Sequence, residues 1–555
     1  MSKKNVRNSF IFQGSILALA GILVRIIGLI YRMPLANILG PEGSGYYSTA
    51  YDIYNVLILL SSQSMPLAVS KLVSEKIGKE EHNNAHKIFK GALIYGLIIG
   101  IAFGLFAYLG ADWLASSVYH SASVARPLKV LAPTLTVACI LGVLRGYFQG
   151  MGNMVPTAIS QIFEQIVNAL VSVIAAYELT TYGYSVSKML SEDKATTVAS
   201  SWGAAGGTLG TLLGAVTALI VLIIIYIRNH SKIRSKIVSC NDKKDDSYAL
   251  ITKMIIFTIT PVLISTTIYN ISNLLDNPIF QNIMSIRFGM SEKIRSSYWA
   301  TYSTQYRTLT TMPIAIAAAL STAIVPSMVR SYSAGDNRQV KEKIESAIKF
   351  SMIIAFPCGI GLSVLGGPIN AILFPRLTFR GIIPYMMIFS VFTVVAFSLS
   401  TISNAILQGI DKLKVPIKNS AISLVIHLII LPILLIVFHL GIYAIVIGDI
   451  LFAVIVCLLN AASIKKYTGY QQEYKKTFLK PLLSSVVMGI VCYGIYWIIE
   501  LMTKSKILST GVAIVVAVFV YGIMIIKTKA ITEEELSGIP KGTIIIKLLK
   551  KFHLI

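Results

Sequence analysis

The stretch FIFQGSILALAGILVRIIGLIYRMPLANIL, residues 10–39, decides the fold class of this chain. It exceeds the roughly 20 apolar residues that a helix needs to cross a bilayer, yet it contains Arg25 and Arg32. Residues seven apart lie on one helical stripe, and Gly28 lies between them on the same side, where it leaves room for a close approach. An arginine at the bilayer centre costs roughly 2.5–3.5 kcal/mol. The stripe is therefore predicted to face a protein interior or a water-filled cavity.

Two interpretations of these arginines remain open. In the first, Arg25 pairs with a carboxylate on a neighbouring helix and the long Arg32 side chain extends to the membrane interface. In the second, both guanidinium groups line a cationic cavity that binds an anionic ligand. The two interpretations predict different neighbours for each guanidinium.

The composition indicates an integral membrane protein. Of 555 residues, 55% are hydrophobic and only 13% are charged, whereas soluble proteins contain about 25% charged residues. The net charge of +24 is not accompanied by a soluble basic domain, so the sequence predicts no nucleic-acid partner. The five cysteines include no CxxC pair, so neither a metal site nor a disulfide framework is predicted. No catalytic residues and no resident cofactor are expected.

Apolar runs separated by polar breaks predict an all-α polytopic protein of about fourteen spans. They lie near 10–39, 46–72, 89–110, 128–150, 156–180, 198–227, 250–276, 298–325, 347–372, 382–407, 416–438, 441–463, 481–500 and 508–526. We expect an N-terminal six-span lobe with its charged linker (1–246), a second six-span lobe (247–465), and a C-terminal part (466–555) with two further spans.

The distribution of lysine and arginine predicts the orientation. With the N-terminus inside, 34 of the 49 basic residues fall in cytoplasmic segments and 11 fall outside, which satisfies the positive-inside rule. Both termini are therefore expected in the cytoplasm. The end of the chain, residues 531–555, contains a basic amphipathic stretch that either lies on the anionic lipids of the inner leaflet or is a solvated end.

An internal repeat supports the two lobes. Gln149-Gly150, Val155-Pro156 and Ser160 recur as Gln408-Gly409, Val415-Pro416 and Ser420, and Met65-Pro66 recurs as Met312-Pro313. Duplicated membrane bundles bind substrate near the midplane where the repeats meet. The repeat and the topology together predict a transporter rather than an enzyme.

Several predicted spans carry polar side chains at helical spacing. Such groups bind one another, which holds the bundle together, or line a cavity; for the charged ones a cavity is favoured. Glu164 and Asp276 either balance the arginines or take up Na⁺ or H⁺. The candidate residues are Arg145, Gln149, Gln161, Glu164, Asn168, Asn270, Asn273, Asp276, Arg307 and Gln408.

Three segments resemble a known family: residues 24–54, 144–165 and 318–337 are similar to the MurJ-like lipid II flippases of the multidrug/oligosaccharidyl-lipid/polysaccharide (MOP) exporter superfamily. The GPEGSGYY element and residues 539–542 look most like the Gram-positive branch that includes stage V sporulation protein B. The resemblance implies two six-helix lobes that alternate access, with a groove for a polyprenyl tail formed by spans thirteen and fourteen.

The resemblance also implies roles for individual residues. Arginines of spans one and eight bind a pyrophosphate in this family, and Arg25 and Arg307 match them, while Arg32 falls within one residue of another. Asp276 matches an acid of span seven. The chain departs from the pattern at Tyr306, which replaces an acid, and at three serines of span two (Ser61, Ser62 and Ser64), which occupy the region of an arginine. Arg145 is a candidate for the missing charge.

These features together predict a flippase in the bacterial plasma membrane that moves undecaprenyl-pyrophosphate-linked peptidoglycan precursor (lipid II) outward. Guanidinium groups would replace the hydration of the pyrophosphate with bidentate hydrogen bonds. The alternatives are a flippase for another lipid-linked oligosaccharide and a cation-coupled drug exporter of the same superfamily. A membrane glycosyltransferase is disfavoured, since the sequence has no large loop with catalytic acids. Cell-wall synthesis proteins are candidate partners.

Overall fold

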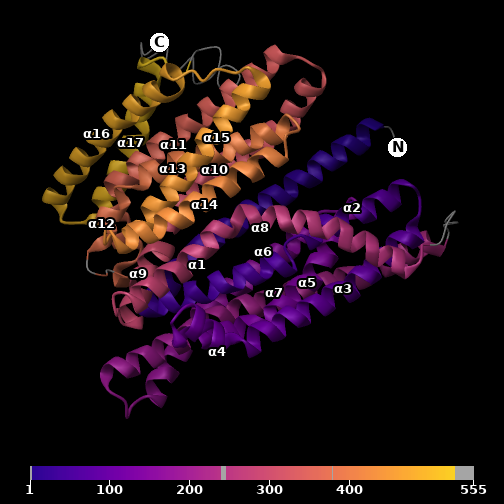
Figure 1. Ribbon diagram of the computed structural model, residues 1–555, viewed down its shortest axis with the longest axis horizontal. Coiled ribbons are helices and arrows are strands. Elements are labelled where there is room, and N and C mark those ends of the chain that lie inside the picture. Colours follow the sequence, from indigo (N-terminus) through magenta and orange to yellow (C-terminus); the bar gives the residue numbers. More distant parts are fainter. Residues whose placement is uncertain (1–2, 239–245, 378, 380, 532–555) are drawn as a thin grey trace. The chain divides into compact units, whose positions relative to one another are not determined.

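The computed structural model describes residues 3–238, 246–377, 379 and 381–531, and within these ranges all secondary structure is helical (Figure 1). This confirms the predicted all-α class. The chain divides into two units, residues 1–300 and 301–555. The predicted amphipathic stretch at residues 532–555 lies outside the described residues.

In the described residues of the first unit, 3–238 and 246–300, there are nine α-helices. They are α1 (Lys3–Ser61), α2 (Met65–Gly78), α3 (His82–Leu109), α4 (Ala111–Trp113), α5 (Ala125–Gly150), α6 (Val155–Val186), α7 (Glu192–Val238), α8 (Tyr248–Ile286) and α9 (Glu292–Ala300). A π-helical turn (Leu114–Val118) and a 3₁₀ turn (Ala122–Val124) join α4 to α5. Helix α6 packs along α7, α3 along α5, and α1 against both α6 and α7.

The second unit begins with a π-helical turn, Thr301–Tyr306. Its helices are α10 (Arg307–Ser333), α11 (Asn337–Leu373), α12 (Ile382–Met387), α13 (Ser390–Gly409), α14 (Lys414–Ile436), α15 (Tyr443–Thr468), α16 (Lys480–Thr503) and α17 (Lys506–Lys527). A 3₁₀ turn (Pro375–Leu377) precedes α12, and a π-helical turn (Lys475–Leu479) precedes α16. Helix α13 packs on α10, α11 and α15, whereas the two C-terminal helices pack on each other and on α11.

In the described part of the chain, eleven helical stretches are long and apolar enough to cross a membrane. The predicted first and second spans form a single stretch, Leu19–Gly78. Helix α1 continues through the predicted break, and its one non-helical residue is Gly40, with φ 66° and ψ −175°. This left-handed region suits a residue without Cβ. The count of fourteen spans stays a prediction.

The division at residue 300 differs from the predicted lobe boundary at residue 246. Helix α8, expected to open the second lobe, packs against α1, α2 and α3 of the first unit. Its Ile251, Ile255 and Ile259 share a buried hydrophobic cluster with residues of those helices, such as Met65 and Phe89. The physical reason for the difference is this apolar face, which is buried within the first unit.

The sequence repeat occupies equivalent helix ends. Helix α5 ends at Gly150 and helix α13 ends at Gly409, and each is followed by a short turn and a helix with proline near its start. A Cβ on Gly150 would lie 2.7 Å from Val73 Cβ of α2, and one on Gly409 would lie 2.8 Å from Met328 Cγ of α10. Both glycines therefore permit the same kind of close helix approach.

Small residues set how closely the helices of the first unit pack. On α7, Gly206, Gly210 and Gly214 follow one another at intervals of four and face α6. A Cβ on Gly206 would lie 2.2 Å from the carbonyl oxygen of Ala175, which is far inside contact distance. Association of membrane helices rests on such close backbone packing, because lipid supplies no hydrophobic driving force between them.

We expect Gly206→Ala to lower the apparent melting temperature of the detergent-solubilised protein, because overpacking against backbone costs about 1–3 kcal/mol. Gly494→Ala is the matched control, since its Cβ on α16 would meet nothing within 4 Å. This control should melt at or slightly above the wild-type temperature, as alanine favours a helix by up to about 1 kcal/mol. A Gly206→Ala protein as stable as the control would contradict the close contact of α6 and α7.

Candidate functional site

Arg25 and Arg32 lie on the first half of α1, and both side chains are exposed. Gly28 between them faces α6, where an added Cβ would lie 3.1 Å from Gln165 Nε2. The room that this glycine leaves is thus filled by a neighbouring amide. Neither guanidinium forms an ion pair with a carboxylate in the described part of the chain. This observation disfavours the interpretation in which Arg25 pairs with an acid.

Tyrosines rather than acids surround Arg32. It lies beside Tyr31 of its own helix segment and beside Tyr47 and Tyr51, which follow the Gly40 kink. The rings of Tyr47 and Tyr51 are 4.7 Å apart, and the Tyr51 hydroxyl is hydrogen bonded to the Thr211 hydroxyl of α7. The kink therefore folds α1 so that both of its halves supply groups around one guanidinium.

The tyrosines were not among the sequence candidates. The available signal was the adjacency of Tyr31 to Arg32 and the i, i+4 spacing of Tyr47 and Tyr51. Such spacing places two rings on one helix face. What the sequence could not supply was the angle at Gly40, which brings the two faces together.

Asn168 is buried where three helices meet. Its amide donates to Tyr31 Oη (3.4 Å), and its carbonyl oxygen accepts from Ser172 Oγ (2.9 Å) and Thr211 Oγ1 (3.4 Å). These bonds join α1, α6 and α7. Asn168 therefore makes polar contacts that hold the bundle together, which is one of the two roles predicted for it. A role in a cavity stays a prediction.

Arg145 and Glu164 form an ion pair within the first unit. Arg145 Nη2 lies 2.6 Å from Glu164 Oε2, and Arg145 Nε donates to Ser160 Oγ at 3.1 Å. The Arg145 side chain is 15% exposed and the Glu164 side chain 31%. The pair links α5 to α6. Glu164 was predicted either to balance an arginine or to take up an ion, and this contact corresponds to the first role. Phosphate binding by Arg145 and ion coupling by Glu164 stay predictions.

A second buried acidic region surrounds Asp52. Its Oδ2 accepts hydrogen bonds from Asn277 Nδ2 (2.7 Å) and from the Trp299 indole nitrogen (3.0 Å), and Asn277 also donates to Thr49 Oγ1 (3.1 Å). Asp276, the neighbour of Asn277 on α8, is only 1% exposed. Helices α1, α8 and α9 thus hold the buried Asp52 carboxylate, and α8 carries a second buried acid, Asp276.

The remaining polar candidates are dispersed. Gln149 donates to Thr157 Oγ1 at 3.4 Å across the turn between α5 and α6. Gln161 is half-buried on α6, and Gln408 is exposed near the end of α13. The side chains of Asn270 and Asn273 lie outside the described residues. For all of these the predicted cavity role is untested.

Arg307 belongs to the second unit, where it directly follows the π-helical turn Thr301–Tyr306. Within this turn the Tyr302 hydroxyl donates to Asp449 Oδ2 of α15, and the Tyr306 hydroxyl lies 2.6 Å from Thr393 Oγ1 of α13. A π-turn widens the helix and is frequent at functional sites. Here it is held by two neighbouring helices. Convergence of Arg307 with Arg25 and Arg32 stays a prediction.

These groups define what each unit can do chemically. In the first unit an exposed stripe of two guanidinium groups is bordered by tyrosine hydroxyls, which suits an anion that accepts several hydrogen bonds. In this unit, Glu164 is engaged by Arg145, and Asp52 is engaged by Asn277 and Trp299. In the described part of the chain, no three His, Cys, Asp or Glu side chains lie close enough to hold a metal ion.

Known proteins resemble this chain in sequence and in fold. The family model described as "Polysaccharide biosynthesis protein" matches residues 13–332, and the model "MatE" matches residues 279–433. Lipid II flippase MurJ of Bacillus subtilis is 24% identical over 93% of each chain. Stage V sporulation protein B of the same organism is 23% identical over 98% of this chain and 100% of that one.

The solved structure "Lipid II flippase MurJ, inward closed conformation" has the same fold, with a TM-score of 0.67, 15% identity, and coverage of 92% of this chain and 97% of that one. With the eleven apolar helical stretches of the described part, this supports a multi-pass membrane protein. The match over residues 13–332 covers more than half of the sequence. The chain therefore belongs to the polysaccharide biosynthesis protein family and is a MurJ-like member of the MOP exporter superfamily.

Proposed function

We propose that this protein is a flippase that moves an undecaprenyl-pyrophosphate-linked saccharide, with lipid II as the first candidate, to the outer leaflet by alternating access. The observation that carries the proposal is the stripe of Arg25 and Arg32. Both guanidinium groups are exposed on a helix within the apolar stretch Leu19–Gly78, and Arg32 is bordered by tyrosines. A diphosphate is the part of such a lipid that hydrocarbon cannot solvate.

The chemistry of the site favours an anionic substrate. Guanidinium groups bind phosphate oxygens bidentately, and neighbouring hydroxyls add neutral donors. A drug exporter for cations would instead need acids that are available for the substrate. In the first unit, Glu164 is paired with Arg145, and Asp52 accepts hydrogen bonds from Asn277 and Trp299. The polyprenyl tail remains in the lipid phase, so only the headgroup needs polar contacts.

The choice of substrate is tested with the full chain in proteoliposomes. Three fluorescent probes are compared: a lipid II analogue, an undecaprenyl-pyrophosphate oligosaccharide without a peptide, and a cationic dye. The proposal expects transport of the first probe. Transport of the second alone would assign the protein to another lipid-linked glycan, and transport of the dye alone would contradict the flippase proposal.

We expect Arg25→Ala and Arg307→Ala each to slow transport by roughly 10–100-fold, because a hydrogen bond to a charged group contributes about 1.5–3 kcal/mol. Membrane abundance should be unchanged. Arg307→Lys should retain part of the activity, since lysine keeps the charge but not the bidentate geometry. Arg126→Ala is the control, because Arg126 is exposed at the start of α5 and lies over the Trp202 ring. Wild-type transport rates in both alanine variants would rule out pyrophosphate binding by these arginines.

The ion pair of Arg145 and Glu164 is tested by charge exchange. We expect Glu164→Gln to change the dependence of transport on pH or Na⁺, because it removes the carboxylate that pairs with Arg145 and that is the candidate acceptor for Na⁺ or H⁺. The double variant Arg145→Glu with Glu164→Arg should fold and yet transport slowly if Arg145 also contacts phosphate. Full activity of this double variant would show that the pair serves packing alone.

A further inference from the structure

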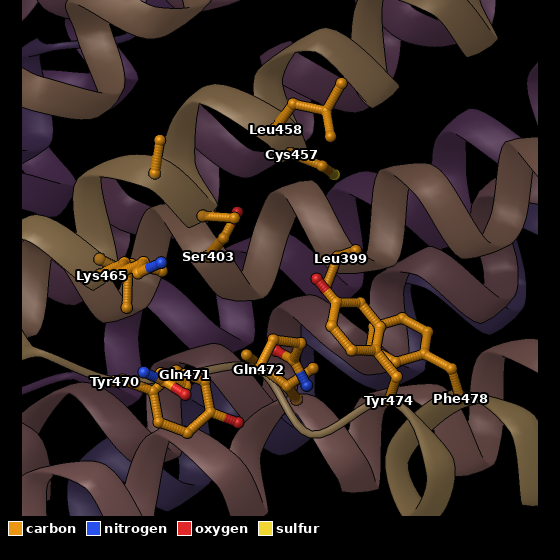
Figure 2. Close-up of a pocket in the computed structure, with 14 residues that line it drawn as sticks. Leu399, Ser403, Cys457, Leu458, Lys465, Tyr470, Gln471, Gln472, Tyr474 and Phe478 are labelled. Carbon is orange, nitrogen blue, oxygen red and sulfur yellow. The ribbon is translucent and has the colours of Figure 1, made fainter.

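A cavity of about 550 Å³ lies in the second unit, and Arg307 is not among the residues that line it. Its walls come from α11, α13 and α15, from the connection after α15, and from the π-turn that precedes α16 (Figure 2). This volume is within the roughly 300–1,000 Å³ of small-molecule sites. All of its lining belongs to one unit.

The interior of this cavity is chemically apolar. Ile348, Leu399 and Phe478 line it, and two of its polar groups, Ser403 and Cys457, are already engaged. Ser403 Oγ donates to Ser400 O at 2.9 Å and accepts from Asn460 Nδ2 at 2.9 Å, while Cys457 Sγ contacts Ala396 O at 3.3 Å. The interior therefore suits a hydrocarbon chain rather than a polar molecule.

The opening faces outward from α15. Leu458 is 66% exposed and Tyr474 is 72% exposed, and Ala461 and Ala462, which also line the cavity, are exposed. Large exposed apolar groups beside a membrane-spanning helix indicate a surface in contact with acyl chains. A lipid can enter such an opening sideways from the bilayer.

One edge of the cavity is polar and cationic. Figure 2 shows Lys465 on one side of the hollow and the rings of Tyr474 and Phe478 on the other. Gln471 adds an amide, and Lys465 belongs to the last turn of α15. No carboxylate is among the lining residues. Glu473 nearby is directed to the following turn, where its Oε2 accepts from the backbone nitrogens of Lys476 (2.7 Å) and Thr477 (3.0 Å).

A buried hydroxyl without a partner marks the same edge. Tyr470 is only 8% exposed and lines the cavity. The Gln472 side chain and the Glu473 backbone lie beside its Oη, but in the described part of the chain no group makes a well-formed hydrogen bond to it. Burial, reinforced by the Glu345 and Glu473 carboxylates, raises the pKa of Tyr470 to about 12. The hydroxyl is thus a neutral donor at physiological pH. A buried donor left unpaired is costly, and a bound acceptor would satisfy it.

We propose that this cavity binds an anionic phospholipid of the adjacent leaflet, with one acyl chain in the apolar interior and the phosphate between Lys465 and the Tyr470 hydroxyl. The segment 465–480 contains five lysines and one acid, and the charge distribution of the chain predicts that it is cytoplasmic. Basic pockets between membrane helices on that side bind anionic headgroups. The site does not depend on which substrate the protein transports.

The test uses the full chain in nanodiscs of phosphatidylcholine that contain a trace of phosphatidylglycerol with a photoactivatable acyl chain. We expect the label on peptides that cover residues 457–478. Lys465→Gln should lower labelling about fivefold, the effect of one lysine near an anionic headgroup. Ala462→Trp should abolish labelling by filling the opening. Melting curves establish that both variants fold.

Two matched controls accompany these variants. Lys466→Gln changes the neighbouring exposed lysine, and Val454→Trp adds an indole elsewhere on α15, at a residue that does not line the cavity. Both should label like the wild type. Equal labelling by phosphatidylcholine with the same photoactivatable chain would overturn the proposed headgroup selectivity. Competition by undecaprenyl phosphate, but not by unlabelled phosphatidylglycerol, would overturn the proposal by assigning the cavity to the transported lipid.

Discussion

The cost of placing a guanidinium group in hydrocarbon is the constraint on which the rest of this structure depends. Arg25 and Arg32 lie on a helix within the apolar stretch Leu19–Gly78, and each would cost several kcal/mol if it faced acyl chains. Neither is neutralised by a carboxylate in the described part of the chain. Arg32 is instead surrounded by tyrosines. A site that keeps its positive charge uncompensated is suited to a substrate that brings the negative charge.

The architecture of the first unit serves this constraint. Gly40 bends α1 so that Tyr47 and Tyr51 return beside Arg32, and the glycines of α7 let α6 approach closely. Asn168 then connects all three helices by hydrogen bonds. Backbone packing and buried polar contacts thus fix the helices that carry the arginines, whereas the arginines themselves contribute charge and little packing.

Much of this could be predicted from the sequence. The apolar runs predict an all-α membrane protein, and the GPEGSG element contains the residue at which α1 bends, although α1 continues as one helix beyond it. The boundary between the units could not be predicted, because the packing of α8 depends on which helices its isoleucine face meets. The sequence shows that α8 follows the charged linker, but it does not show which helices α8 packs against.

The candidate site was predictable in its residue types and less so in its contacts. The stripe of Arg25 and Arg32 follows from helical spacing, but the pairing of Arg145 with Glu164 requires the register of α5 against α6. The tyrosines beside Arg32 depend on the angle at Gly40. The cavity beside Lys465 could not be predicted from the sequence. Its apolar lining looks like that of any membrane span, and its polar edge belongs to a short connection between helices.

The central claim is that the arginines of α1 recognise a diphosphate. Its most direct test is native mass spectrometry of the full chain with undecaprenyl pyrophosphate and undecaprenyl monophosphate in equal amounts. The account predicts that the wild-type protein prefers the diphosphate and that Arg25→Gln combined with Arg32→Gln abolishes this preference while the protein still binds polyprenyl lipid. An unchanged preference in the double variant would contradict it.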